Sequence, residues 1–176
     1  AERHRFLGLV IKESERLTRL INQVLDLAKI ESGLAEWRTA ELDPSEIVVE
    51  AVNATSAIFR SRGVRVEAKV APGVPMVMAD RDRLMQVLLN LLSNAVKFCT
   101  PGSGRVEVRL SGDAQAIRID VEDNGVGIGP EHLALIFEKF RQGRTAVPGN
   151  DALTREHSGS GLGLSIVKEL CKLLGG

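Results

Sequence analysis

Three short segments of the chain carry residue types from which a nucleotide site could be built. The first, Asp123-Asn124-Gly125-Val126-Gly127-Ile128, follows an alternating strand pattern, and its two glycines let the backbone turn tightly beside a ligand. A carboxylate at position 123 could accept a hydrogen bond from an exocyclic amine, which would select adenine over guanine. Asp-Asn-Gly is also a common turn, so this segment alone leaves a purely structural role open.

The second segment is Gly159-Ser160-Gly161-Leu162-Gly163-Leu164, between a polar stretch and an apolar helical pattern. Its backbone N–H groups could point at phosphates from the start of a helix. A dinucleotide-binding fingerprint would need a strand before the glycines, and a P-loop would need Lys followed by Ser or Thr, and the segment has neither. It therefore predicts a phosphate-binding loop of another kind, or a hinge without a ligand.

The third segment places Asn90, Asn94 and Lys97 about one turn apart on a predicted helix. An amide oxygen is a hard ligand that could join ATP phosphate oxygens and water around Mg²⁺, and an ammonium group would offset phosphate charge. Asparagines on helices are more often solvated or capping. These three residues therefore indicate a nucleotide site only in combination with the two glycine-bearing segments.

The rest of the sequence predicts the elements that position these segments. Apolar periodicity predicts helices over about 44–62, 80–98 and from Leu162 onward, and alternation predicts strands near 64–70, 75–78, 106–110 and 117–121. Residues 143–161 are polar and aperiodic, which predicts a long loop. We expect an α+β fold, a two-layer α/β sandwich with three helices on one face of a mixed, mostly antiparallel sheet.

Residues 2–31 predict a separate, long amphipathic helix. Its apolar stripe comprises Phe6, Val10, Leu17, Ile21, Val24 and Ala28. Such a helix could pair with another helix in a hairpin or coiled coil, or pack on its own domain. We divide the chain into this helix with its end (1–33), a connector (34–42) and a globular domain (43–176).

Composition narrows the possible functions. Lys plus Arg and Asp plus Glu are both 23, so no net charge favours nucleic acid. The two cysteines, Cys99 and Cys171, show neither metal-ligand spacing nor the density of a disulfide scaffold. No apolar run approaches the roughly 18 residues that cross a bilayer. We expect a cytoplasmic piece of a longer protein that is either soluble or anchored in the inner membrane.

The three segments together resemble the site of the GHKL ATPases, which have the Bergerat ATP-binding fold. Within that superfamily the chain looks most like the catalytic domain of bacterial sensor histidine kinases of two-component systems. Asn90-Leu91-Leu92-Ser93-Asn94-Ala95-Val96-Lys97-Phe98 resembles their N box, and Ile136-Phe137-Glu138-Lys139-Phe140 resembles their F box. Residues 15–31 are similar to the second helix of their dimerisation and phosphotransfer domain.

The resemblance implies ATP and Mg²⁺ as ligands and a role for each candidate residue. Asp123 would read adenine, Asn94 would hold Mg²⁺, and Lys97 with the amides of 161–163 would bind phosphates. Arg155 and His157 lie on the loop that resembles the ATP lid. The full set of ATP-binding candidates is Asn90, Asn94, Lys97, Asp123, Gly125, Gly127, Ile128, Phe140, Ser160, Gly161, Leu162 and Gly163.

The resemblance also implies an activity, a protein-histidine kinase acting in a homodimer. The γ-phosphoryl would pass to a histidine of the dimerisation domain and then to an Asp of a response regulator. No histidine in this chain has the phosphoacceptor's neighbourhood, and we expect both that histidine and further C-terminal strands outside residues 1–176. Hydrolytic GHKL members carry a Glu base where this chain has Asn90, which cannot accept a proton. A GHKL ATPase and a non-catalytic ATP-binding or dimerisation module stay as alternatives.

Overall fold

The computed structural model describes residues 2–33, 36–141 and 160–176. The chain divides into two compact units, with the boundary after Glu36. The first unit contains one long helix, α1 (Glu2–Glu31), which ends where Gly33 takes a φ of 69°. No helix in the described part of the chain is long and apolar enough to cross a membrane.

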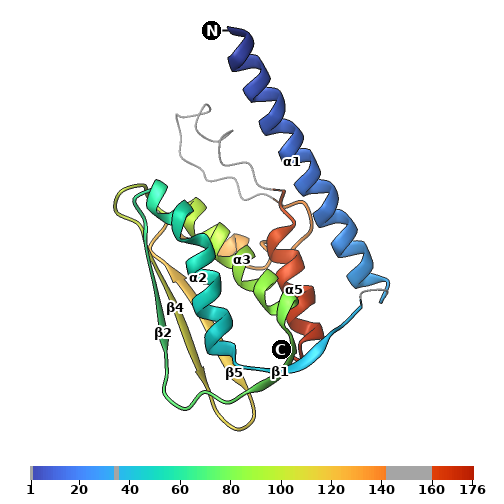
Figure 1. Ribbon diagram of the computed structural model, residues 1–176, viewed down its shortest axis with the longest axis vertical. Coiled ribbons are helices and arrows are strands. Elements are labelled where there is room, and N and C mark those ends of the chain that lie inside the picture. The colour runs from blue at the N-terminus through green and yellow to red at the C-terminus, as the bar shows by residue number, and fades with distance from the viewer. Residues whose placement is uncertain (1, 34–35, 142–159) are drawn as a thin grey trace. The chain divides into compact units, whose positions relative to one another are not determined.

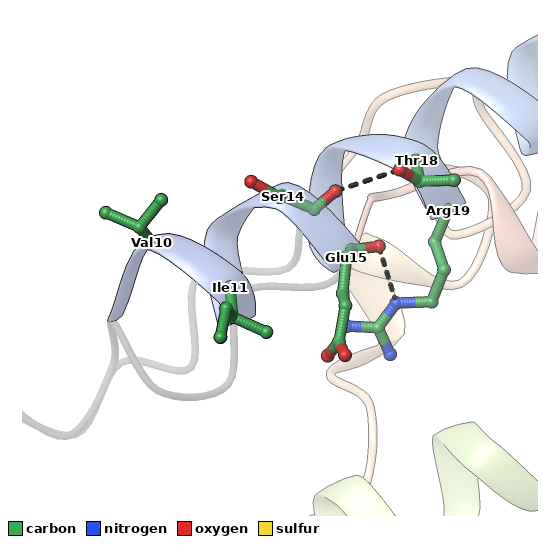
Figure 2. A pocket seen from close by; sticks show the side chains of 6 residues that line it. All are labelled: Val10, Ile11, Ser14, Glu15, Thr18 and Arg19. Carbon is green, nitrogen blue, oxygen red and sulfur yellow. Dashed lines mark hydrogen bonds between the residues drawn. The ribbon is translucent and has the colours of Figure 1, made fainter. Parts of the chain in front are cut away.

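The predicted apolar stripe of α1 lies on its exposed surface. Phe6, Val10, Leu17, Ile21 and Val24 are between 42% and 66% exposed. Figure 2 shows a shallow hollow on this helix, lined by Val10, Ile11, Ser14, Glu15, Thr18 and Arg19. The described residues therefore leave this stripe exposed.

The second unit follows the predicted order of helices and strands (Figure 1). Residues 39–42, which the sequence assigned to the connector, form a strand instead. The elements are β1 (Thr39–Leu42), α2 (Pro44–Ser61), β2 (Arg65–Val70), β3 (Val77–Asp80), α3 (Arg81–Phe98), β4 (Arg105–Gly112), β5 (Ile117–Asp123), the short 3₁₀ helix η1 (Pro130–His132) and α5 (Gly163–Leu173).

The strands form two sheets. In the larger sheet, of order β2-β4-β5, β2 pairs with β4 in parallel and β4 pairs with β5 antiparallel. In the smaller sheet β1 pairs with β3 antiparallel, with Thr39 opposite Asp80. The mixed, mostly antiparallel pairing expected from the sequence is confirmed, although the strands do not join in a single sheet.

The hydrophobic core lies between the larger sheet and the helices (Figure 1). Helices α2 and α3 pack on the sheet, and α5 packs beside α3. The following core side chains are at most 2% exposed: Ile47, Val48, Phe59, Leu88, Leu92, Val106, Val108 and Leu110. Burying each large apolar side chain contributes about 1.5–3 kcal/mol. This core holds α3, the helix that carries the candidate amides, in place. The packing of helices on a mixed sheet confirms the α+β class.

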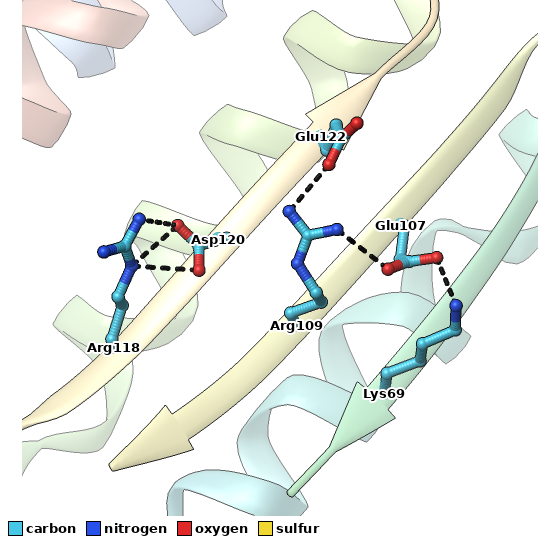
Figure 3. A network of polar contacts seen from close by, with 6 residues as sticks. All are labelled: Lys69, Glu107, Arg109, Arg118, Asp120 and Glu122. Atoms are coloured by element: carbon cyan, nitrogen blue, oxygen red, sulfur yellow. Dashed lines mark hydrogen bonds and ion pairs between the residues drawn. The ribbon is translucent and has the colours of Figure 1, made fainter.

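The other face of the larger sheet is charged. Glu107 on β4 accepts from Lys69 at 2.5 Å and from Arg109 at 2.9 Å, and Arg109 reaches Glu122 at 2.6 Å (Figure 3). Arg118 pairs with Asp120 on the same face. These pairs are exposed and surrounded by water, so they keep this face soluble and contribute little to stability.

Both long helices of the second unit begin with an aspartate cap. The Asp43 carboxylate accepts the Ser45 backbone N–H at 2.7 Å at the start of α2, where Pro44 occupies the first helical position. The Asp80 carboxylate accepts the Arg83 N–H at 3.1 Å at the start of α3. Aspartate is among the residue types preferred at this position, because its side-chain oxygen accepts a backbone N–H that the helix leaves unpaired.

Candidate nucleotide site

Helix α3 carries the first group of candidate residues. Its buried side includes Leu88, Leu92 and Val96, which fixes the direction of its other faces. Asn90, Asn94 and Lys97 lie outside this buried set and are half-buried. They therefore line the edge of the helix, where a ligand can reach them.

The N-terminus of α5 meets the two amides. A Cβ atom built on Gly163 would lie 3.6 Å from Asn90 Oδ1 and 3.8 Å from Asn94 Nδ2. No side chain caps α5, so the N–H groups of its first turn are available to an anion. Two segments about 70 residues apart in the sequence, both among the candidates, are thus brought together.

The loop before α5 packs against the end of the F box. Gly161 has a φ of 71°, and a Cβ on it would lie 2.8 Å from the Phe140 carbonyl carbon and 2.9 Å from Arg141 O. The Ser160 hydroxyl accepts the Leu162 N–H at 3.2 Å, and Leu162 is fully buried. The glycine at 161 is therefore needed for both its backbone conformation and its close approach.

The Asp123 turn lies against the C-terminal end of α3, at Phe98. The Asp123 carboxylate accepts the Gly125 N–H at 2.9 Å, and the Phe98 carbonyl accepts the Val126 N–H at 3.4 Å. A Cβ on Gly125 would lie 2.6 Å from that same carbonyl oxygen. Gly127 has a φ of 71°, a backbone conformation that residues with a side chain rarely adopt.

Two residues that hold this turn were not among the predicted site residues. The Asn124 side-chain oxygen accepts the Arg105 N–H at 2.7 Å, and its amide donates to Ser103 O at 3.4 Å. The Phe98 carbonyl is the second support. The sequence held a signal for Asn124, because it follows directly on an Asp at the end of a strand. It held none for the Phe98 carbonyl, whose contact depends on tertiary packing.

The electrostatic setting of Lys97 favours an anion. Burial lowers the pKa of its ammonium group, and the nearby Arg62 cation lowers it further. Arg62 also donates to the Lys97 carbonyl at 3.5 Å, and the Lys97 ammonium lies 4.7 Å from the centre of the Phe98 ring. A partly desolvated cation beside a second cation gains free energy when a phosphate approaches.

The F box flanks the start of α5. Among the described residues, Phe140 is the only non-glycine with positive φ, at 60°, a conformation that costs roughly 1–2 kcal/mol. Phe137 and Phe140 are 39% and 64% exposed. A hollow between this segment and α5 is lined by Ala134, Phe137, Glu138, Lys139, Ser165, Lys168 and Glu169.

The remaining candidates are more scattered. Ile128 follows the Asp123 turn and is 51% exposed. The two lid candidates, Arg155 and His157, lie outside the described residues. In the part of the chain that the structure describes, no group of three His, Cys, Asp or Glu side chains could hold a metal ion.

Comparisons with known proteins agree with this geometry. The family model described as histidine kinase-, DNA gyrase B-, and HSP90-like ATPase matches residues 79–176, which include all of α3, the Asp123 turn and α5. Hybrid signal transduction histidine kinase B of Dictyostelium discoideum is 36% identical over 175 residues, covering 97% of this chain. The histidine protein kinase DivJ of Caulobacter vibrioides is 37% identical over 171 residues, also covering 97%.

Solved structures give the same result. Full-length ShkA in complex with AMPPNP matches with a TM-score of 0.82 and 30% identity, over 99% of this chain and 35% of that one. The nucleotide-free catalytic domain of ThkA matches with a TM-score of 0.62 and 26% identity, over 76% of this chain and 79% of that one. The chain spans 9% of the Dictyostelium relative and 27% of DivJ. It belongs to the family of histidine kinase-, DNA gyrase B- and HSP90-like ATPases, as the ATP-binding catalytic part of a sensor histidine kinase.

Proposed function

We propose that this domain binds ATP with Mg²⁺ and holds the γ-phosphoryl group for transfer to a histidine of a dimerisation and phosphotransfer domain. One observation carries the proposal: Gly163, at the start of α5, faces the amides of both Asn90 and Asn94. Membership of the ATPase family supports ATP as the nucleotide. The complex of the related ShkA with AMPPNP supports the same choice.

The adenine end of the ligand is assigned to the Asp123 turn. One carboxylate oxygen already accepts the Gly125 N–H, which leaves the other to accept a hydrogen bond from the exocyclic amine of adenine. Gly125 and Gly127 keep the rim of the turn free of side chains. The exposed Ile128 offers apolar surface to the purine beside them.

The triphosphate end is assigned to the edge of α3 that carries Asn90, Asn94 and Lys97, and to the start of α5. Lys97 supplies a positive charge, and the N–H groups of Gly161 and Gly163 supply donors at a helix N-terminus. Ser160 and Leu162 shape the loop, because the Leu162 N–H is held by the Ser160 hydroxyl. The backbone of Phe140 packs closely against Gly161 and so supports this loop.

The donor set fits Mg²⁺ bound mainly through the nucleotide. Asn94 offers one hard amide oxygen, and no cluster of three acidic, His or Cys side chains exists in residues 2–33, 36–141 and 160–176. Mg²⁺ commonly keeps several waters and takes its other ligands from substrate phosphates. Mg²⁺ would neutralise phosphate charge during transfer, while Asn94 keeps it in place.

The residues favour phosphoryl transfer over hydrolysis. A neutral imidazole is already nucleophilic, so a new N–P bond can form as the bond between the γ-phosphorus and the bridging oxygen breaks, releasing ADP. Hydrolysis by contrast needs a base that takes a proton from water, and Asn90 cannot do so. Catalysis then consists of positioning and charge neutralisation by this domain.

The partners follow from the family and from α1. We infer that residues 1–33 are the second helix of the dimerisation and phosphotransfer domain, and that the exposed stripe from Phe6 to Val24 pairs with other helices of a homodimer in the full-length protein. The histidine acceptor, the response regulator that receives the phosphoryl group, and a cytoplasmic location belong to this proposal. Arg155 and His157 are assigned to the lid over the γ-phosphate.

Calorimetry with ATP and Mg²⁺ tests the site. In the Asp123→Asn variant the side-chain oxygen still accepts the Gly125 N–H, so the turn is retained while the charged acceptor for adenine is lost. A hydrogen bond to a charged group is worth about 1.5–3 kcal/mol, so affinity should fall roughly 10- to 150-fold. Asp113→Asn is the matched control, because Asp113 also accepts backbone N–H groups, from Gln115 and Ala116, in the turn between β4 and β5. Equal affinity in all three proteins would contradict the assigned site.

A second assay separates the kinase from its two alternatives. The chain is incubated with γ-labelled ATP and a separately supplied phosphoacceptor domain. Label on the acceptor identifies the kinase, release of free phosphate alone identifies a GHKL ATPase, and nucleotide binding without either identifies a non-catalytic module. We expect no label on the chain itself, whose His4, His132 and His157 lack the neighbourhood of a phosphoacceptor.

A further inference from the structure

The two ends of α3 contact two different parts of the chain. The C-terminal half carries Asn90, Asn94 and Lys97. The N-terminus contacts residues 37–42 of the connector, which include β1. Asp80 and Asn94 are separated by 14 helical steps, or about 21 Å at 1.5 Å per residue. A rigid helix of this length joins the connector to the nucleotide site.

The chain passes from strand to helix at a potential pivot. Strand β3 ends at Asp80 and α3 begins at Arg81, with no loop between them. The connector strand β1 pairs only with β3 among the described strands. Without a brace, the β1–β3 ribbon could turn relative to α3 at this junction while its own hydrogen bonds stayed intact.

The Asp80 side chain braces this pivot. One carboxylate oxygen accepts the Arg83 N–H of α3 at 3.1 Å, and the other accepts the Arg38 N–H of the connector at 2.8 Å. Asp80 is 5% exposed. Burial opposes its ionisation, but these backbone donors outweigh burial and hold the pKa of the carboxyl below its ordinary value of 3.8. Both contacts therefore involve a carboxylate at neutral pH.

A second contact crosses the same pivot. The Arg83 guanidinium lies over the Trp37 ring, 5.9 Å from its centre, and also donates to Gln86 further along α3. The connector is thus attached to α3 through two side chains of different chemistry. The cap of α2 has no such role: Asp43 accepts only the Ser45 N–H within its own helix start.

We propose that Asp80 is a positioning residue that locks the connector to α3, so that the connector's position and nucleotide binding at Asn90, Asn94 and Lys97 influence each other. A change at one site that alters the equilibrium at another must work in both directions. Nucleotide binding therefore changes the surroundings of Trp37, and release of the connector changes nucleotide binding. This inference rests on the proposed nucleotide site.

The chain supplies its own probe, because Trp37 is its single tryptophan. Trp37 fluorescence is followed while AMPPNP with Mg²⁺ is added, and calorimetry measures the affinity of the same sample. In the unaltered chain we expect a saturable fluorescence change whose midpoint matches the calorimetric Kd. Heat without any fluorescence change overturns the inference and leaves the proposed function standing. No heat at all contradicts both.

Two variants remove the brace from opposite sides. Asp80→Ser keeps a good cap for Arg83 but cannot also reach the connector, since serine has one short side-chain oxygen. Arg38→Pro removes the connector's N–H and leaves the cap of α3 untouched. Asp43→Ser is the matched control, since it alters an aspartate cap that braces nothing else. Circular dichroism checks that each variant folds.

The expected result separates the brace from the cap. Asp80→Ser and Arg38→Pro should reduce the nucleotide-induced fluorescence change at least threefold or weaken the Kd at least threefold, whereas Asp43→Ser should match the unaltered chain. Position 38 is next to the Trp37 probe, so a smaller fluorescence change in Arg38→Pro can be a local effect. It is remote from the nucleotide residues, so a weaker Kd in Arg38→Pro reports coupling. The inference is overturned if folded Arg38→Pro retains both the fluorescence change and the Kd of the unaltered chain.

Discussion

Replacing Gly161 by alanine tests the packing of the phosphate loop. Alanine at a φ of 71° costs about 1–2 kcal/mol, because its Cβ crowds the following carbonyl. That Cβ would also lie 2.8–3.0 Å from backbone atoms of Phe140 and Arg141, which cannot rotate away as a side chain would. Overpacking of this kind costs about 1–3 kcal/mol. We therefore expect Gly161→Ala to lower the free energy of unfolding by about 2–5 kcal/mol.

The neighbouring glycine provides the contrast. Gly163 begins a helix, and a Cβ there would make only ordinary contacts, 3.6 Å or more from Asn90 and Asn94. Gly163→Ala should leave stability unchanged or raise it by up to about 1 kcal/mol through helix propensity. Its methyl group would nevertheless occupy the space assigned to the phosphates and Mg²⁺, so nucleotide affinity should fall at least tenfold.

Urea unfolding and calorimetry with ATP and Mg²⁺ on the same samples distinguish these effects. Gly161→Ala should lose stability, and Gly163→Ala should lose affinity while staying stable. The reasoning fails for the loop if Gly161→Ala unfolds at the same urea concentration as the unaltered chain and binds ATP equally well. It fails for the site if Gly163→Ala binds ATP with unchanged affinity.

Two further variants test the charge and the chemistry of the site. Lys97→Met should leave stability unchanged or slightly higher while ATP affinity falls at least tenfold, as calorimetry would detect. Because the folded pKa of Lys97 lies below its ordinary 10.5, the unaltered chain should gain stability as pH rises toward 10.5, and urea unfolding of Lys97→Met should lack that gain. Asn90→Glu places a base where this chain has an amide, so phosphate release from ATP should rise at least tenfold. An unchanged release rate would show that a missing base does not limit hydrolysis.

Helix α3 could be predicted from the sequence because its signals are local. Asp80 supplies the cap, the apolar period defines the buried face, and the observed Arg81–Phe98 agrees with the predicted end near Phe98. The relation of Asn90, Asn94 and Lys97 to one another follows from helix geometry alone. Local periodicity therefore predicted the placement of these three candidate residues.

Strand β1 was missed because it has only four residues, too few for the alternation of Thr39-Ala40-Glu41-Leu42 to distinguish a strand from a connector. Three of the four are exposed, and the strand exists through its pairing with β3 about 38 residues later. The division into two sheets was missed for the same reason. Pairing partners depend on contacts between distant segments, and short strands contain too little local information to specify them.

Close backbone approaches were also beyond the sequence. The sequence placed Gly125 in a turn beside a ligand and Gly161 in a phosphate loop or hinge, but it did not predict that Gly161 meets Phe140 or that Gly125 meets the Phe98 carbonyl. A glycine in a sequence indicates an unusual backbone conformation or a close contact, but it does not identify the neighbouring residue. The role of Asn124 as the support of the Asp123 turn stayed hidden because its donor, Arg105, begins a different strand.

The packing of α3 limits how a signal could pass along it. Leu88 and Leu92 are fully buried in the core, so rolling the helix would open cavities at a cost comparable to the 2–5 kcal/mol of a Leu→Ala change at each position. Coupling between sites is typically worth 1–3 kcal/mol, which is too little to roll it. A small pivot at the Asp80 junction keeps the core contacts and moves the connector against the helix. We therefore expect a perturbation of the connector to act through the contacts of Asp80 with Arg38 and Arg83, and not through a rotation of α3.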